Sequence, residues 1–287
     1  MKGRFIGYRR EHHPPKNPSS QNRLLDLSAH IFPKKRLGQV FLADRNVAKK
    51  MISACHLTAA DTVLEIGAGL GTLTEAIAGL VKKVIAIETD KRFCLRLSDQ
   101  FKGRNVAVIQ ADFLKYDMDT LPSGLIAIGN LPYYISSPII AKLLKHRKYF
   151  ASIFITVQLE FGRRMVARPH TKDYSALTCL VQYYAQCQML FGIKKTSFRP
   201  MPKVDSCFMH LALRDEPLFP AADESWLFKI IHHAFQQRRK TILNALNPII
   251  AKDKLSPILD SLKMNPHLRP ENLSIKDFVD MANASLS

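Results

Sequence analysis

The fold can be inferred from one stretch, Thr62-Val63-Leu64-Glu65-Ile66-Gly67-Ala68-Gly69-Leu70-Gly71. The first five residues are typical of a short buried strand, the glycines of a tight turn, and residues 72–77 of the helix that follows. Glycine allows the backbone to turn sharply and leaves room for a ligand at the strand tip. A nicotinamide-binding loop would have glycine in place of Thr72, so the dinucleotide pattern is broken and a nucleoside ligand is favoured.

Glu88, Asp112 and Asn130 each follow or close a later apolar run. Strands and helices alternate in βαβ order, which predicts a doubly wound, largely parallel sheet that binds its ligand at the carboxyl ends of the strands. There Glu88 can accept hydrogen bonds from two ribose hydroxyls, and Asp112 can accept one from an adenine amine. Each acid alone is also typical of a solvated loop. The ordered set favours S-adenosylmethionine as cofactor, and therefore an α/β, Rossmann-like methyltransferase domain.

Asn130-Leu131-Pro132-Tyr133 predicts the chemistry of the site. The side-chain oxygen of Asn130 and the carbonyl of Leu131 can both accept hydrogen bonds from an adenine amine, which points the nitrogen lone pair at an electrophile. Pro132 would fix the turn and Tyr133 would stack on the base. No metal and no covalent enzyme intermediate is required. The alternative is a strand end followed by a proline turn, which any α/β protein can contain.

Phe198 precedes two prolines, Pro200 and Pro202, which stiffen a loop. We expect this loop to hold Phe198 at the pocket mouth, where it and Tyr133 would sandwich the target adenine. The alternative is that Phe198 is a hydrophobic plug under the loop.

Several segments together resemble the small-subunit ribosomal RNA adenine dimethyltransferases of the KsgA type. They are residues 39–42, 65–71, 130–133, 198–206, 235–241 and 269–274, with Glu88 and Asp112. The resemblance implies methyl transfer from S-adenosylmethionine to two adjacent adenosines in the 3'-terminal hairpin loop of small-subunit ribosomal RNA, late in subunit assembly. A sister family methylates large-subunit RNA, but Leu131 and the run at 202–206 favour the small-subunit enzyme.

The resemblance also assigns the cofactor site. Its predicted residues are Gln39, Val40, Leu42, Glu65, Gly67, Gly69, Gly71, Glu88, Asp112 and Asn130. Val40 stands where the family commonly has Asn or His, which leaves only a backbone contact at this position. Leu159 stands where the family often has Lys, which removes one RNA phosphate contact.

Composition favours a nucleic-acid partner. The 287 residues contain 42 Lys and Arg against 24 Asp and Glu, a net charge of +18, which predicts binding to a polyanion such as the RNA of the small ribosomal subunit. No apolar run is long enough to span a bilayer, and no signal sequence opens the chain. We expect no membrane association, no metal site, no disulfide and a monomeric protein. The motif details resemble the bacterial branch of the family, which implies the bacterial cytoplasm, with an organelle as the alternative location.

The chain divides into three predicted parts. Residues 1–33 are a basic tail that we expect to be disordered, 34–213 form the methyltransferase domain, and 214–287 form a small all-helical domain. Within the second part, residues 174–186 are predicted to be a core helix and 204–213 a returning strand. In the third, an apolar stripe precedes Arg238, Arg239 and Lys240, which we expect to dock on the RNA backbone; a solvated basic face is the alternative. A ribosome-assembly factor with little catalysis remains a rival function.

Overall fold

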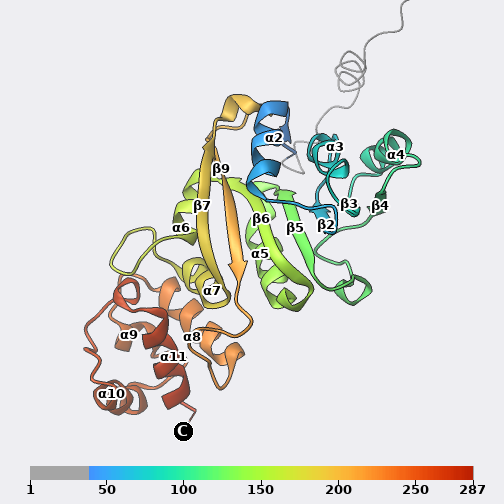
Figure 1. Ribbon diagram of the computed structural model, residues 1–287. Coiled ribbons are helices and arrows are strands. Elements are labelled where there is room, and N and C mark those ends of the chain that lie inside the picture. Colours follow the sequence, from blue (N-terminus) through green and yellow to red (C-terminus); the bar gives the residue numbers. More distant parts are fainter. Residues whose placement is uncertain (1–38, 287) are drawn as a thin grey trace, which may run out of the picture.

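A computed structural model describes residues 39–286, and its central element is a seven-stranded sheet (Figure 1). The predicted tail at 1–33 lies outside the described residues. In spatial order the strands are β4 (Val106–Gln110), β3 (Lys83–Glu88), β2 (Thr62–Ile66), β5 (Leu125–Asn130), β6 (Phe150–Gln158), β9 (Ser206–Leu213) and β7 (Ala185–Ile193). The first five are parallel, and β9 and β7 join antiparallel. The predicted doubly wound, largely parallel sheet is confirmed.

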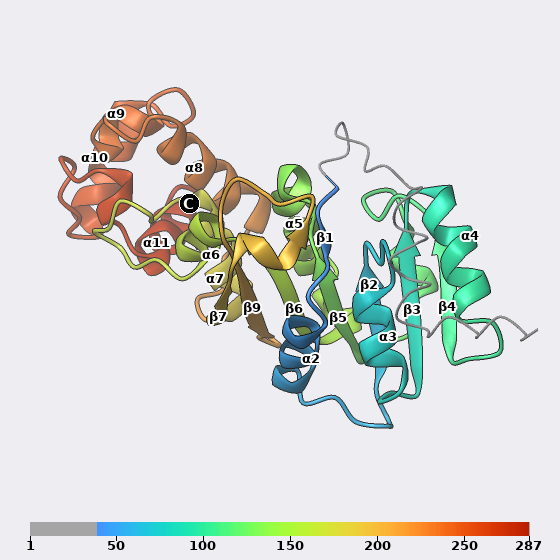
Figure 2. The same ribbon diagram turned by 90° about the horizontal axis from the view of Figure 1, so that it is seen from above.

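Helices cover both faces of the sheet (Figure 2). On one side lie α2 (Arg45–Ala54), α3 (Thr72–Ala78) and α4 (Lys91–Gln100), and on the other α5 (Ser136–Lys145), α6 (Leu159–Met165) and α7 (Ala176–Tyr184). Alternate residues of a strand point to opposite faces. Leu64 and Ile66 of β2 therefore belong to one apolar cluster, whereas Val63 belongs to the other. This two-sided burial explains why the parallel strands are apolar almost throughout.

The strand β7 is the main difference from the sequence prediction. The core helix expected over 174–186 ends at Tyr184, and Ala185 already pairs with Leu213 of β9. Exposed Gln186 and Gln188 alternate with half-buried Cys187 in this strand. This alternation with a period of two indicates a half-buried strand. The apolar residues of α7 directly precede it, and for this reason the helix was predicted to continue to residue 186.

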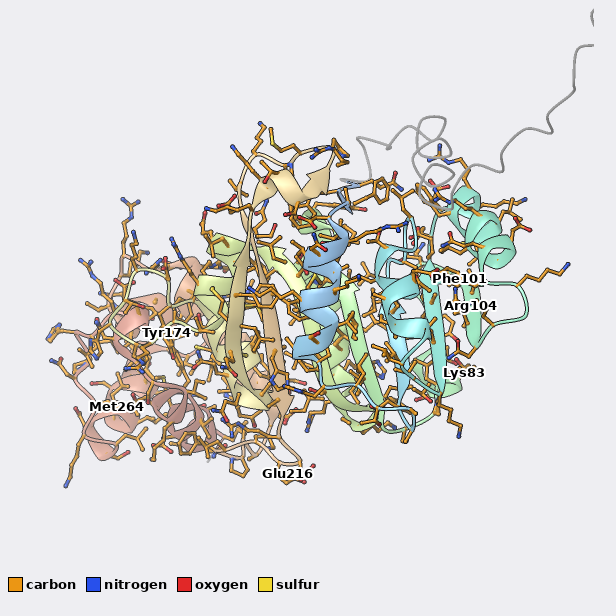
Figure 3. All side chains as sticks on the ribbon, turned by 45° about the horizontal axis from the view of Figure 1, so that its top comes forward. Lys83, Phe101, Arg104, Tyr174, Glu216 and Met264 are labelled. Carbon is orange, nitrogen blue, oxygen red and sulfur yellow. The ribbon has the colours of Figure 1, made fainter. Side chains whose placement is uncertain are left out.

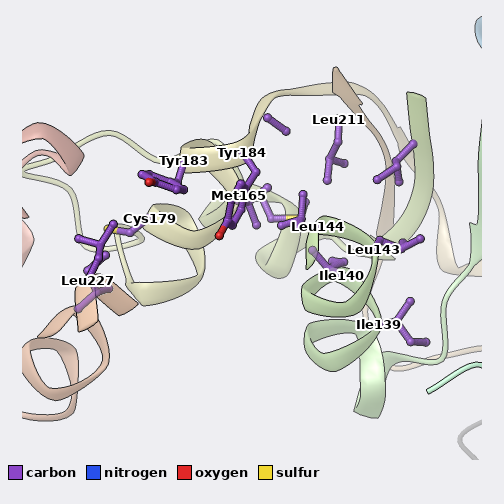
Figure 4. Close-up of a cluster of buried hydrophobic side chains, with 14 of the residues drawn as sticks. Ile139, Ile140, Leu143, Leu144, Met165, Cys179, Tyr183, Tyr184, Leu211 and Leu227 are labelled. Atoms are coloured by element: carbon purple, nitrogen blue, oxygen red, sulfur yellow. The ribbon is translucent and has the colours of Figure 1, made fainter. Parts of the chain in front are cut away.

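The described residues after β9 form helices and loops only. The α-helices are α8 (Glu224–Gln236), α9 (Ile242–Leu246), α10 (Lys252–Ser261) and α11 (Ile275–Ala284). Tyr174 and Met264 mark this helical end of the molecule, on the opposite side from Lys83 (Figure 3). The apolar cluster of the sheet continues into it, since Leu143 of α5, Tyr183 of α7 and Leu227 of α8 belong to one cluster (Figure 4). The domain boundary at 213/214 stays a prediction.

A second, two-stranded sheet fastens the beginning of the described chain to a distant loop. β1 (Phe41–Leu42) pairs antiparallel with β8 (Phe198–Arg199). The carbonyl of Ser197 accepts hydrogen bonds from Ala43 N at 2.9 Å and Asp44 N at 3.2 Å. We call residues 39–43 the strap. The strap borders the carboxyl ends of the parallel strands, where the predicted site lies.

Candidate functional site

A cavity of about 380 Å³ opens where the strap meets the carboxyl ends of the parallel strands. It brings together nine of the ten predicted cofactor residues: Gln39, Val40, Leu42, Glu65, Gly67, Gly69, Glu88, Asp112 and Asn130. The structure does not bring Gly71 to this cavity. Gly71 instead lines a separate groove between α2, α3 and α4, and its positive φ of 82° lets the chain turn into α3.

The glycine loop and Glu88 are locked together. The Gly69 amide donates a hydrogen bond of 2.9 Å to one carboxylate oxygen of Glu88, and the Asp90 amide donates one of 2.8 Å to the other. A carboxylate has about four acceptor positions, so each oxygen retains capacity for a ligand hydroxyl. A Cβ on Gly69 would lie 3.0 Å from the Phe41 ring, and φ there is 52°. A side chain at 69 would therefore be strained, which favours glycine, and Phe41 is a pocket residue that the sequence prediction missed.

Glu65 is a buried acid in the pocket wall. Its side chain is 1% exposed and accepts a 2.6 Å hydrogen bond from the Thr74 hydroxyl. The pKa of Glu65 is raised to about 7, chiefly by burial and also by the nearby charge of Glu88, while the hydrogen bond from Thr74 lowers it. A positively charged ligand in this cavity would relieve the repulsion between the two carboxylates. S-adenosylmethionine, with its ammonium and sulfonium groups, fits such a wall.

Lys142 holds the loop that carries Asp112. Its ammonium on α5 donates to the carbonyls of Phe113, Leu114 and Tyr116 at 2.8, 3.1 and 2.5 Å. Each of the three N–H groups of the ammonium can thus donate to a separate carbonyl. Asp112 itself accepts from the Leu114 amide at 2.9 Å, and both residues line the pocket. The sequence prediction missed Lys142, since its partners are backbone atoms of a distant loop.

Asn130 lines the pocket with a side-chain amide of fixed orientation. Its amide nitrogen Nδ2 lies 2.8 Å from the Val40 carbonyl. A carbonyl can only accept, so this contact fixes the orientation of the amide and leaves Oδ1 on the other side. Oδ1 is buried and has no hydrogen-bond partner among the described residues. An unsatisfied buried acceptor is costly unless a ligand donates to it.

The rest of the segment forms the pocket wall beside Asn130. Leu131, Pro132 and Tyr133 all line the cavity. The Leu131 amide donates to the Thr156 carbonyl at 3.1 Å, and the Pro132 carbonyl accepts from the Ile135 amide at 3.1 Å, which closes the turn. Tyr133 and its neighbour Tyr134 follow in this turn, and Tyr134 is 58% exposed.

The expectation that Phe198 stands at the pocket mouth is wrong. Its side chain is fully buried and does not line the cavity. Phe198 pairs with Leu42 of the strap, and its ring packs in the same apolar cluster as Ile193 and Phe208. The next residue, Arg199, is exposed instead, as strand alternation requires. Phe198 is therefore better described by the alternative interpretation, a hydrophobic plug under the loop.

The three basic residues after α8 differ from one another. Arg239 and Lys240 are exposed. Arg238 is half-buried: its Nε donates to the Glu271 carboxylate at 2.7 Å and its Nη2 to the Lys172 carbonyl at 2.6 Å. Arg238 therefore ties the end of α8 to two other segments, and the free cations of the trio are Arg239 and Lys240.

Within residues 39–286, no helix is both long and apolar enough to cross a bilayer. No group of three or more His, Cys, Asp or Glu side chains in this range is placed to hold a metal ion.

Several known proteins are similar to this chain over most of its length. The sequence matches the family described as ribosomal RNA adenine dimethylase over residues 32–285. The ribosomal RNA small subunit methyltransferase A of Moorella thermoacetica is 39% identical over 265 residues, which cover 88% of this chain and 92% of that protein. Its counterpart in Shouchella clausii is 37% identical over 283 residues, 94% of this chain and 95% of that protein.

Solved structures support the same relationship. A dimethyladenosine transferase from Plasmodium falciparum has a TM-score of 0.72 and 29% identity, covering 84% of this chain and 95% of that protein. The 23S rRNA methyltransferase ErmE has a TM-score of 0.65 and 25% identity, covering 86% of this chain and 100% of that protein. The family match includes the whole cofactor pocket and the helical part. The resemblance drawn from the sequence is thus confirmed, and the chain belongs to the ribosomal RNA adenine dimethylase family.

Proposed function

We propose that this protein dimethylates the exocyclic amines of two adjacent adenosines in the 3'-terminal hairpin loop of small-subunit ribosomal RNA, with S-adenosylmethionine as methyl donor. The observation that carries the proposal is the unpartnered Oδ1 of Asn130, buried in the wall of a pocket that also contains Glu65, Glu88 and Asp112. The relatives named for the small subunit, at 37 to 39% identity, favour that substrate over large-subunit RNA.

The pocket residues divide the work of holding the cofactor. Glu88 would accept from ribose hydroxyls, Asp112 would accept from the cofactor's adenine amine, and the Glu65 carboxyl, which is ionised above its pKa of about 7, would attract the cationic end. The glycine loop lets the nucleoside approach the backbone. When bound, S-adenosylmethionine supplies an electrophilic methyl group on a positively charged sulfur.

The protein's share of the reaction is to orient the target amine. Asn130 Oδ1 and the Leu131 carbonyl would accept the two N–H bonds of adenine, and Tyr133 would stack on the ring. Charge that develops on the nitrogen is then stabilised by acceptors already in place. A nitrogen–carbon bond forms as the sulfur–carbon bond breaks. The methylated nitrogen next loses its proton to water, so no strong base is required.

RNA binding would use the exposed cations of the helical end. We expect Arg239 and Lys240 to contact backbone phosphates, whereas Arg238 is held by Glu271 and would act as a structural tie. Each phosphate contact that is lost reduces the salt slope of binding by about 0.7 to 0.9. Arg239→Glu should therefore weaken binding to the ribosomal particle and flatten its salt dependence, and Arg238→Ala should chiefly lower stability.

Other expectations rest on the family and not on the geometry. The bacterial relatives favour the bacterial cytoplasm as the place of action. A role late in subunit assembly, a monomeric state and the function of the tail at 1–33 stay predictions.

The test is methyl transfer to purified, unmethylated small ribosomal subunits. Labelled S-adenosylmethionine is added, the product is mapped by nuclease digestion, and Asn130→Ala is assayed in parallel. Dimethyladenosine in the terminal hairpin that is lost in the variant would support the proposal. Tight particle binding without any transfer would favour the rival function, an assembly factor with little catalysis.

A further inference from the structure

The hydroxyl of Tyr133 has a dedicated partner. It lies 2.6 Å from Oγ of Ser206, and either oxygen can be the donor. Ser206 is fully buried. It is the first residue of β9 and also the last of the run at 202–206, which the resemblance singled out and to which the proposed chemistry gives no role.

Ser206 is fixed from both sides. Within the sheet it stands between Gln158 at the end of β6 and Ile193 at the end of β7. The preceding residue is bound in three ways: the Asp205 carbonyl accepts from the Leu159 amide at 3.0 Å, and its carboxylate accepts from Lys195 N at 2.9 Å and Lys194 Nζ at 3.1 Å. The Ser206 hydroxyl is therefore a rigid anchor.

Tyr133 needs such an anchor because its backbone lies in a single 3-10 turn, Tyr133–Ile135. A short turn defines the base of the side chain but leaves ring rotation free. The bond at the far end of the ring removes that freedom. A tyrosine phenol is protonated at neutral pH and burial raises the pKa of Tyr133 further, so the hydrogen bond persists there.

We infer that Ser206 is a positioning residue for the target adenine: it holds the ring of Tyr133 in the plane on which the base stacks. The inference rests on the proposed stacking role of Tyr133. Ser206 has no direct contact with the base in this scheme and acts only through the phenol.

The test is a double-mutant cycle of Ser206→Ala and Tyr133→Phe, both of which remove the same hydrogen bond. We expect each single variant to lower kcat about 10-fold through misplacement of the base, and the double variant to lower it no further. The dissociation constant for S-adenosylmethionine should change less than about twofold, because neither group is assigned to the cofactor.

Ser152→Ala is the matched control. Ser152 lies on β6 and its hydroxyl contacts His210 Nε2 of β9 at 2.7 Å, so this variant also removes a serine hydrogen bond that involves β9, but one that does not reach Tyr133. The control should retain wild-type kcat. The inference is overturned if Ser206→Ala behaves like the control, or if the effects of the two cycle variants multiply.

Tyr133→Leu separates this inference from the function on which it rests. If Tyr133→Leu retains kcat, stacking by Tyr133 is wrong and the inference falls with it. If Tyr133→Leu lowers kcat but Ser206→Ala and Tyr133→Phe do not, stacking stands and only the role of Ser206 is refuted.

Discussion

Replacing Asn130 by alanine should impair chemistry much more than folding. The side chain makes one structural hydrogen bond, Nδ2 to the Val40 carbonyl at 2.8 Å, and presents one free acceptor, Oδ1. Loss of the hydrogen bond should reduce the free energy of unfolding by about 1 to 2 kcal/mol. Loss of an acceptor aimed at the reacting amine should raise the activation free energy by about 3 kcal/mol, which is a fall of more than 100-fold in kcat.

Asn105 provides a matched control for this prediction. Its Nδ2 donates to the Val81 carbonyl at 2.7 Å, so Asn105→Ala loses the same kind of bond outside the pocket. The two variants should have similar free energies of unfolding in urea. At saturating S-adenosylmethionine, their kcat values for methyl transfer should differ by about two orders of magnitude. Equal kcat values for the two variants would refute the role of Oδ1. A loss of cofactor binding in Asn130→Ala as large as the loss of kcat would make Asn130 part of the scaffold.

Three further perturbations test the loop that carries Asp112, the buried acid Glu65 and the contact between β2 and β5. Lys142→Met removes three hydrogen bonds from the loop that carries Asp112. This variant should bind S-adenosylmethionine about 10-fold more weakly, as measured by calorimetry. An unchanged affinity would contradict the role given to this loop. Glu65 has a folded pKa of about 7 against an ordinary 4.5, so the folded protein retains a proton that the unfolded chain releases, and stability falls as pH rises from about 4.5 to 7. Glu65→Gln should remove this decline, about 3 kcal/mol between those limits, in urea titrations of the cofactor-free protein. A Cβ at Gly129 would lie 2.9 Å from the Ile66 carbonyl, whereas one at Gly79 meets nothing within 4 Å. Gly129→Ala should therefore lower the free energy of unfolding by about 1 to 3 kcal/mol, and Gly79→Ala should leave it nearly unchanged. Equal denaturation midpoints for the two variants would show that β2 and β5 separate without strain.

Local sequence was enough to predict the parallel sheet and most of the pocket. The run from Thr62 to Gly71 contains a strand, a turn and a helix start whose signals depend only on neighbouring residues. Strand-end positions then place Glu88 and Asp112 at one edge without any knowledge of their contacts.

The parts that failed depend on contacts between distant residues. Phe198 was misplaced because its pairing with Leu42 cannot be inferred from a proline-rich loop. Arg238 was taken for a free cation because its partner, Glu271, lies in another helical segment. The bond from Asn130 to Val40 was likewise invisible, although the type of residue at 130 did predict an acceptor.

The pairing of the strap with β8 has a consequence for synthesis of the protein. All the acidic residues of the pocket and the Asn130 segment precede Phe198 in the chain, yet the strap gains its partner strand only when Arg199 is available. Contacts of such high sequence separation form late, because the entropy of closing the intervening loop must first be overcome. A nascent chain can thus complete the glycine loop and the first parallel strands, but a closed cofactor pocket has to wait until translation has passed β8.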